Sequence, residues 1–173
     1  FCFRWAQFIG DNDLKIATKE AGQLKKYIQA HPEISDVLIT GGDPLVMKTK
    51  NLRAHIEPLL ELEQIRTIRI GSKALTFWPQ RVVSDADAQD LLDLCEEVMA
   101  SGKNLALMGH YNHWQELETD IAREAVKRVR ATGAVIRAQG PLLAHINDNA
   151  DDWARLWQTQ VELGIIPYYM FVE

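Results

Sequence analysis

The sequence predicts an α/β protein in which parallel strands form one partial barrel. Five short apolar runs, rich in β-branched and aromatic residues, alternate with five amphipathic helical patterns. Such runs indicate buried parallel strands, and their regular alternation with helices indicates right-handed crossover units. Polar residues follow several successive runs, which favours a barrel with one shared opening at the carboxyl ends of its strands. A doubly wound open sheet is the alternative, and it would concentrate its site at one switch point.

The composition is typical of a single globular domain, which we place over residues 1–173. The chain is 47% hydrophobic and 25% charged, with a formal net charge of -5. Its acidic and basic residues are interleaved, so no basic surface for nucleic acid is indicated. No apolar run approaches the roughly 20 residues that span a bilayer, and no signal peptide is visible. We therefore expect a cytoplasmic protein with neither nucleic-acid nor membrane partners.

The first half of the chain predicts two helix–strand units. A helix over residues 18–30 has one apolar face and leads to the strand-like run SDVLITGG at 35–42. A second helix covers residues 49–64 and leads to IRTIRIGS at 65–72. Because proline lacks the backbone N–H and clashes with the preceding turn, Pro58 predicts a kink or a restart inside this second helix.

The second half predicts three more units. The third helix has Ser84 as its N-cap and Gly102 as its stop. The fourth helix covers residues 114–131 and is stopped by Gly133, and the fifth covers residues 148–163 and is stopped by Gly164. The acidic start of the fifth suits the positive end of the helix dipole. The strands that follow these helices are predicted at 104–112, 134–143 and 165–172.

The two cysteines call for different interpretations. Cys95 lies in DLLDLCEEVMASG, where it shares one helix face with Leu91, Leu94 and Val98, so we expect a core thiol. Cys2, in FCFR, belongs to no such apolar pattern. Two thiols do not make a disulfide framework, so Cys2 is a candidate for other chemistry.

Two strand ends in the first half carry candidate site residues. In TGGDPL, Gly41 and Gly42 would let the backbone approach a ligand closely, and Asp43 could hold an ammonium group. An ordinary turn capped by Asp43 is the alternative there. In RIGSKALTFWPQR, Arg69 should point into the barrel and meet an anion or a carboxylate, and Arg81 could clamp a phosphate or carboxylate, or lie on the surface.

Two strand ends in the second half add further candidates. In GHYNHW, His110 should form hydrogen bonds at the strand end, and His113 should cap or start the next helix. A metal site on this histidine pair is disfavoured, because no HExxH pattern or nearby acidic ligand accompanies it. In RAQGPLLAHIND, Gln139 could pair with both a donor and an acceptor of a ligand, whereas Asp148 suits a helix cap.

Together, these blocks resemble the lysine 2,3-aminomutase family of radical S-adenosylmethionine (SAM) enzymes. FCFR resembles the end of the cluster loop C-x-x-x-C-[RK]-[FY]-C-x-R, and TGGDPL resembles S-G-G-D-x-L. RIGSKALTFWPQR resembles R-I-G-S-R followed by P-Q-R, and GHYNHW resembles T-H-x-N-H-P. QGPLLAHIND and PYYMFVE resemble N-Q-S-V-L-L-x-G-V-N-D and P-Y-Y-I-Y-Q-C-D. The chain departs from these motifs at several positions, including Gly109 for Thr and Gly140-Pro141 for Ser-Val.

The resemblance implies a partial TIM-type (β/α)6 barrel of the radical SAM type, of which this chain would hold roughly strands 2 to 6. It implies a [4Fe–4S] cluster, SAM and pyridoxal 5′-phosphate (PLP), which together generate a 5′-deoxyadenosyl radical and drive 1,2-amino migration on an amino acid. It also implies an electron donor such as flavodoxin or ferredoxin and is compatible with a homo-oligomer. The first two cluster cysteines and the PLP lysine would lie outside this sequence.

Residue roles follow from the same resemblance. Cys2 matches a cluster ligand, and Arg4 matches the residue that holds the substrate carboxylate. Arg81 matches a position near the PLP phosphate. No residue of this sequence is assigned a catalytic step. The positions that match contacts to SAM are Gly41, Gly42, Asp43, Ser72, His110 and Gln139.

Three alternatives to an amino-acid 2,3-aminomutase stay open on the sequence. The first is the related enzyme that makes β-lysine for attachment to a translation elongation factor. The second is a non-catalytic barrel that has lost the cluster. The third is a barrel lyase or phosphate-binding protein that uses Arg69 and Arg81 without iron.

Overall fold

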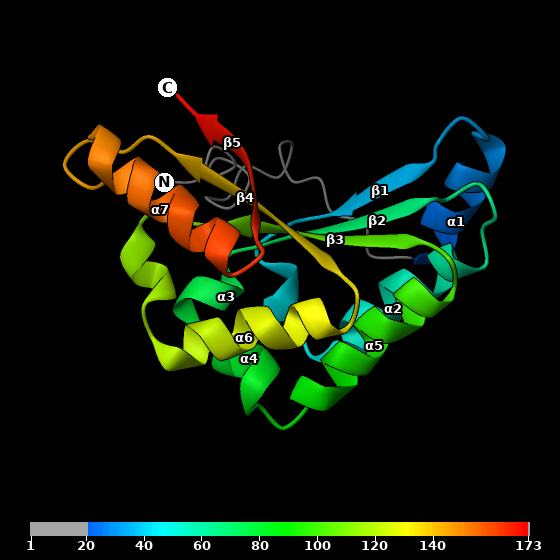
Figure 1. Cartoon of the computed structure of the whole chain (residues 1–173). Helices are drawn as coiled ribbons and strands as arrows, with labels where there is room; N and C mark the ends of the chain where they lie inside the picture. Colours follow the sequence, from blue (N-terminus) through cyan, green and yellow to red (C-terminus); the bar gives the residue numbers. More distant parts are fainter. Residues whose placement is uncertain (1–20, 173) are drawn as a thin grey trace, which may run out of the picture.

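The computed structural model describes residues 21–172, which form an α/β structure around one parallel sheet (Figure 1). The sheet contains five strands in the order β1-β2-β3-β4-β5, and every neighbouring pair is parallel. All five predicted strands are thereby confirmed. Their bounds are Asp36–Ile39 for β1, Thr67–Ser72 for β2, Asn104–His110 for β3, Val135–Pro141 for β4 and Ile166–Phe171 for β5.

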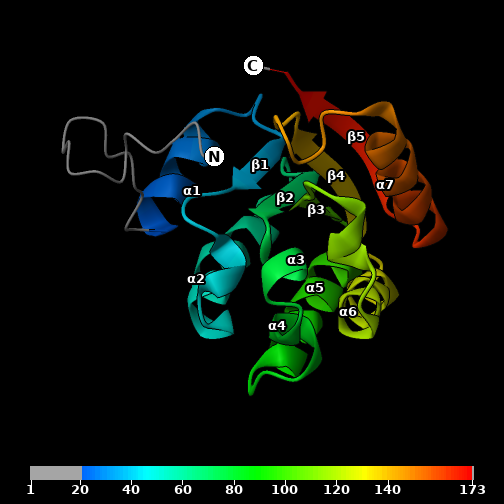
Figure 2. The same cartoon turned by 90° about the vertical axis from the view of Figure 1, so that its left-hand side faces the viewer.

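The strand order decides between the two predicted closures. Each strand pairs with the next one along the chain, so the connections progress in one direction across the sheet. Right-handed crossovers that progress in one direction place their helices on the same face. Figure 2 shows the strands following an arc, with the helices between them on its outer side. This arrangement is consistent with a partial barrel and differs from a doubly wound sheet, which is covered on both faces.

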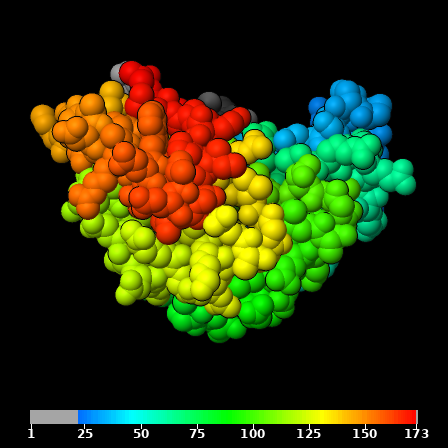
Figure 3. Space-filling view, in the orientation of Figure 1, coloured from blue at the N-terminus to red at the C-terminus, as the bar shows by residue number. Residues whose placement is uncertain are grey.

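Nine helical segments accompany the strands among the described residues. The longer α-helices are α1 (Ala21–Ala30), α2 (Thr49–Leu60), α5 (Ala88–Ala100), α6 (Asp120–Ala131) and α7 (Ala150–Glu162). The short ones are α3 (Ala74–Phe77) and α4 (Gln80–Val83), with the 3-10 turns η3 (Pro44–Val46) and η4 (Trp114–Leu117). In the space-filling view, α7 and β5 lie side by side at one end of the sheet (Figure 3). No helix within residues 21–172 is long and apolar enough to cross a membrane.

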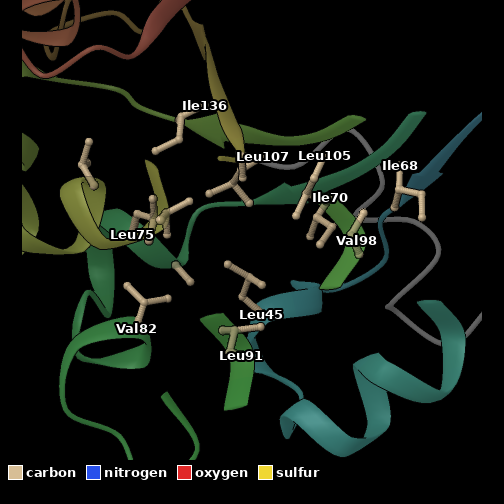
Figure 4. Close-up of a cluster of buried hydrophobic side chains, with 14 of the residues drawn as sticks. Leu45, Ile68, Ile70, Leu75, Val82, Leu91, Val98, Leu105, Leu107 and Ile136 are labelled. Carbon is tan, nitrogen blue, oxygen red and sulfur yellow. The ribbon is translucent and has the colours of Figure 1, made fainter. Parts of the chain in front are cut away.

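The core lies between the outer face of the sheet and the helices. Alternate residues of each strand point to one face, so Ile68 and Ile70 of β2 are buried on the helix side with Leu105 and Leu107 of β3. The close-up shows these side chains facing those of the surrounding helices (Figure 4). The other face of β2 and β4 carries Arg69, Arg137 and Gln139, which are only partly buried.

Two predicted helix boundaries are wrong: the start of the third helix and the continuity of the fourth. Ser84 ends α4 and does not cap the third helix, which begins at Ala88 after Asp87. The segment before Asp87 instead folds around the buried guanidinium of Arg81, which bonds the Asp87 carboxylate. The predicted helix over residues 114–131 is split into η4 and α6, because the hydroxyl of Thr119 accepts a hydrogen bond from Ala122 N and starts a new helix.

The remaining boundaries match the predictions closely. Helix α2 runs through Pro58 without a restart and ends two residues later at Leu60, short of the predicted Gln64. Gly102, Gly133 and Gly164 all have positive φ angles directly after helices, as expected for glycine stops. Helix α7 carries the predicted acidic residues in its first turn, but the predicted cap at Asp148 is wrong: Asn149 is the N-cap, and the Asp148 carboxylate instead accepts from His145 N within the loop.

We expect Cys95→Ala to lower the free energy of unfolding by only about 1 kcal/mol and to leave any bound cofactor in place. Cys95 lies on α5 against the apolar core, as predicted. Burial, followed by the nearby Glu96 carboxylate, raises the pKa of its thiol to about 12. Native protein at pH 8 should therefore alkylate slowly at Cys95, which peptide mass spectrometry after iodoacetamide treatment can measure. Rapid alkylation of the folded protein would contradict this core assignment.

Candidate functional site

Four of the predicted SAM-contacting residues lie at one edge of the sheet, where the strands end. Ser72 is the last residue of β2 and pairs in register with Gly109, the neighbour of His110 on β3. His110 pairs in register with Gln139 of β4. Asp43 follows β1 and receives a hydrogen bond from the Ser72 hydroxyl, with an Oγ–Oδ1 distance of 2.7 Å. The fold thus brings together residues that are 96 positions apart in the chain, from Asp43 to Gln139.

The Asp43 carboxylate ties the ends of β1 and β2 together. Its Oδ1 accepts from Leu45 N at 3.0 Å as well as from Ser72, and its Oδ2 accepts from Lys73 N at 2.7 Å. The Ser72 hydroxyl, whose one proton goes to Asp43, also accepts from Ala74 N at 2.9 Å. An ionised carboxylate offers about four acceptor positions, so three donors leave Asp43 room for one more, such as an ammonium group.

The glycines before Asp43 leave open space beside their backbone. Among the residues that the structure describes, no neighbouring atom lies within 4 Å of a Cβ atom built on Gly41 or on Gly42. Packing within the described structure therefore does not require glycine at either position. A ligand that approaches the backbone closely would require it, because a side chain would occupy that space.

His110 is partly buried at the end of β3 and contacts a polar side chain. Its Nε2 lies 2.7 Å from Asn112 Oδ1. Burial lowers the pKa of His110, and the positive charge of Lys73 lowers it further, whereas Asn112 and Glu116 act in the opposite sense. A neutral imidazole retains one N–H donor and one acceptor, so it can form hydrogen bonds without adding charge to the site.

Gln139 is oriented by Tyr169, a residue to which the sequence analysis gave no role. The Tyr169 hydroxyl donates to Gln139 Oε1 at 2.6 Å, which leaves the amide NH2 group as the donor toward a ligand. Burial raises the pKa of Tyr169, so the phenol keeps the proton that it donates. The pairing depends on an irregularity between β4 and β5, where the register shifts after Ala138. No local sequence pattern reveals that shift.

Further hydrogen bonds join the loops after β2, β3 and β4. Lys73 Nζ donates to Glu116 Oε1 at 2.6 Å, and Asn112 N donates to Glu116 Oε2 at 2.7 Å. The buried Asn147 donates from Nδ2 to the carbonyl oxygens of Asn112 and Pro141, at 2.7 Å and 3.0 Å. Together with Asp43, these side chains link four successive loops at the carboxyl edge. These contacts could not be predicted from the sequence, because each joins residues that are distant in the chain or whose roles depend on loop geometry.

Arg81 is a buried residue that fastens two loops to each other. Its Nε donates to Leu45 O at 2.7 Å, and its Nη2 donates to Met47 O at 3.1 Å and to Thr49 Oγ1 at 2.9 Å. Its Nη1 donates to Asp87 Oδ1 at 2.9 Å, and only 1% of the side chain is exposed. A contact with a PLP phosphate would require this set of hydrogen bonds to open, so the predicted phosphate role stays a prediction.

Other predicted residues are placed as follows. Arg69 meets a carboxylate on the inner face, as expected, with its Nε 2.8 Å from Asp36 Oδ1. His113 is the N-cap of η4 and accepts from Gln115 N, which confirms its predicted capping role. Cys2 and Arg4 lie outside the described residues. Within residues 21–172, no group of three or more His, Cys, Asp or Glu side chains could hold a metal ion.

Tyr111 accounts for two of the departures from the motifs. A Cβ atom at Gly109 would lie 2.7 Å from Cε2 of the Tyr111 ring, and one at Gly140 would lie 2.1 Å from the Tyr111 carbonyl oxygen. Tyr111 is 1% exposed, and its N–H donates to Gln139 O at 2.9 Å. The buried Tyr111 thus packs against both Gly109 and Gly140, and there is no room for a side chain at either glycine.

Comparison with known proteins assigns the chain to a family. No protein-family model matches the chain. It is 40% identical over 171 residues to a putative L-lysine 2,3-aminomutase of Aquifex aeolicus (strain VF5), which covers 99% of this chain and 44% of that protein. The chain belongs to the lysine 2,3-aminomutase family.

Two further members of the lysine 2,3-aminomutase family show the same relationship. The L-lysine 2,3-aminomutase of Escherichia coli (strain K12) is 31% identical over 147 residues, which are 85% of this chain and 40% of that enzyme. The L-lysine 2,3-aminomutase of Bacillus subtilis (strain 168) is 29% identical over 171 residues, which are 99% of this chain and 34% of that enzyme. The chain thus spans less than half the length of these relatives.

Proposed function

We propose that the protein is a radical SAM amino-acid 2,3-aminomutase that uses a [4Fe–4S] cluster, SAM and PLP. The observation that carries this proposal is the set of polar groups at the carboxyl edge of the sheet, in a chain of the lysine 2,3-aminomutase family. Asp43, His110 and Gln139 come from three different strand ends and share that edge. Sites of barrel enzymes are built at this edge, from the loops that follow the strands.

The residues at this edge fit the amino-acid part of SAM. Gly41 and Gly42 leave open space beside the backbone, and Asp43 keeps acceptor capacity for the ammonium group. The Gln139 amide donates, since Tyr169 occupies its oxygen. The neutral His110 adds hydrogen bonding without charge. Ser72 acts indirectly in this proposal, by fixing the carboxylate that receives the ammonium group.

The chemistry itself comes from the bound groups. The cluster and SAM supply a carbon radical for hydrogen abstraction, and PLP supplies the means of moving an amino group to the neighbouring carbon. The residues of this chain bind and orient: the linked loops hold the carboxylate, imidazole and amide at fixed separations. We further propose Cys2 as a cluster ligand and Arg4 as the partner of the substrate carboxylate. Arg81 is proposed near the PLP phosphate. The electron donor would be a flavodoxin or ferredoxin, and the compartment the cytoplasm.

The experiment that tests this function is an amino-acid panel. Protein from the complete reading frame is reconstituted anaerobically with iron, sulfide and PLP, then incubated with SAM, a reductant and single amino acids. We expect one amino acid to give a β-amino acid, detected by mass spectrometry after derivatisation. Cluster-containing protein that cleaves SAM but converts none of the amino acids would exclude the aminomutase reaction while retaining the radical SAM assignment.

A further inference from the structure

The ion pair between Lys73 and Glu116 is connected to the imidazole of His110 through Asn112. Lys73 follows β2 and Glu116 lies in η4, so the pair joins the loops after β2 and β3. Its two side chains are 32% and 22% exposed, which is more buried than most surface pairs. Lys73 stands where the R-I-G-S-R motif has its second arginine, so this sequence keeps the positive charge on a different side chain.

Each member of the pair is connected to the site by a second contact. Lys73 donates its backbone N–H to Asp43 Oδ2 at 2.7 Å. Glu116 Oε2 accepts from Asn112 N at 2.7 Å and from His113 N at 3.3 Å. The Asn112 side chain in turn reaches His110 Nε2 at 2.7 Å. The Lys73–Glu116 pair therefore holds Asn112 in place, and Asn112 in turn orients the His110 imidazole. The two members of the pair come from the loops after β2 and β3.

We propose that Lys73 and Glu116 are positioning residues that set both the orientation and the charge state of His110. Glu116 orients the ring through Asn112, and Lys73 keeps a positive charge beside it that opposes protonation. This proposal rests on the proposed binding of SAM at the same edge, where a protonated His110 would repel the positively charged sulfonium and ammonium groups of SAM. A neutral imidazole avoids that repulsion and can still form a hydrogen bond with the ligand.

Lys73 and Glu116 have opposite effects on the pKa of His110. Burial is the largest cause that lowers the pKa of His110, the Lys73 ammonium lowers it further, and the Glu116 carboxylate raises it. On the neighbouring strand, Gln139 faces His110 in register and is uncharged. Tyr169, which bonds Gln139, keeps its proton because burial raises the pKa of its phenol. Lys73 and Glu116 are thus the charged groups of the described loops that adjust the pKa of His110, in opposite directions, beyond the lowering that burial causes.

The test is a titration of His110 by NMR in protein labelled with ¹³C at histidine Cε1, without SAM. Lys73→Met should raise the pKa of His110, because the ammonium is removed and Glu116 is left unneutralised. Glu116→Gln should lower the pKa further, because Lys73 is left unneutralised, while the amide oxygen can still accept from Asn112 N. Lys73→Arg should restore the wild-type titration. His110→Gln identifies the resonance, and the other four imidazoles report on the fold.

The matched control is Lys25→Met, which breaks another Lys–Glu pair, Lys25–Glu61, between α1 and α2. It should leave the His110 titration unchanged. Lys73→Met should also weaken SAM binding in calorimetry by up to about tenfold, because a protonated His110 repels the positive charges of SAM, whereas Glu116→Gln should leave SAM affinity close to wild type. Shifts of the same sign in Lys73→Met and Glu116→Gln, or no shift in either, would overturn the proposal. Because the titration is done without SAM, its outcome is independent of whether the proposed function is correct.

Discussion

Replacing Arg81 with methionine is expected to lower the free energy of unfolding by about 3 kcal/mol or more. The guanidinium donates to Leu45 O, Met47 O, Thr49 Oγ1 and the Asp87 carboxylate. Methionine fills a similar volume but leaves these buried acceptors without donors, and each unsatisfied group costs about 1–3 kcal/mol. Urea unfolding followed by circular dichroism measures the loss, and an unchanged slope would show that the two-state transition is retained.

Two further variants make this result specific. Arg81→Lys keeps the charge but cannot reproduce the fork of donors, so it should recover only part of the lost stability. Arg53→Met is the control, because Arg53 also bonds a carboxylate, Glu97, but that carboxylate belongs to an exposed side chain and Arg53 itself is only partly buried. It should cost less than about 1 kcal/mol. An Arg81→Met protein as stable as wild type would show that the two loops do not depend on this guanidinium, and would favour the proposed phosphate role.

Gly140→Ala is expected to have the second largest effect, a loss of about 1–3 kcal/mol or more. The added Cβ would lie 2.1 Å from the Tyr111 carbonyl oxygen. Backbone cannot move aside as the end of a flexible side chain can, and Tyr111 N is already bonded to Gln139 O. The clash should therefore separate the ends of β3 and β4, which carry His110 and Gln139. Chemical denaturation measures the loss of stability.

Gly71→Ala is the matched control on a neighbouring strand. Its Cβ would meet Thr40 Oγ1 at 3.6 Å, which is an ordinary contact. Both glycines lie in strands near the carboxyl edge, so conformational propensity changes in the same way for the two. Gly71→Ala should change stability by less than about 1 kcal/mol. Equal losses in the two variants would mean that Tyr111 is not the cause.

The sequence was most informative where local pattern decides structure. The five strands follow from apolar runs, and the glycine stops at Gly102, Gly133 and Gly164 follow from helix geometry. The edge at which Asp43, His110 and Gln139 meet also follows, because parallel strands end together. These features depend on periodicity and on single-residue preferences, which the sequence displays directly.

Features that depend on distant partners could not be predicted. Helix α5 begins later than predicted because Asp87 is held by Arg81 and Thr49. Nothing in the local sequence around Ser84 indicates that contact. The roles of Glu116 and Asn147 likewise come from loops that meet only in the folded chain. Arg81 was assigned a ligand role because an arginine in a loop suggests anion binding, whereas its burial among carbonyl oxygens is a tertiary property.

Reductive cleavage of SAM tests the central claim most directly, namely that the carboxyl edge of this sheet binds SAM. Protein from the complete reading frame, carrying a reconstituted cluster, is mixed anaerobically with SAM and reductant, and 5′-deoxyadenosine is measured by mass spectrometry. We predict that 5′-deoxyadenosine forms, that Gln139→Leu reduces its rate at low SAM concentration by about tenfold, and that Gln158→Leu on the exposed side of α7 does not. Protein that carries the cluster and yet forms no 5′-deoxyadenosine would contradict the claim.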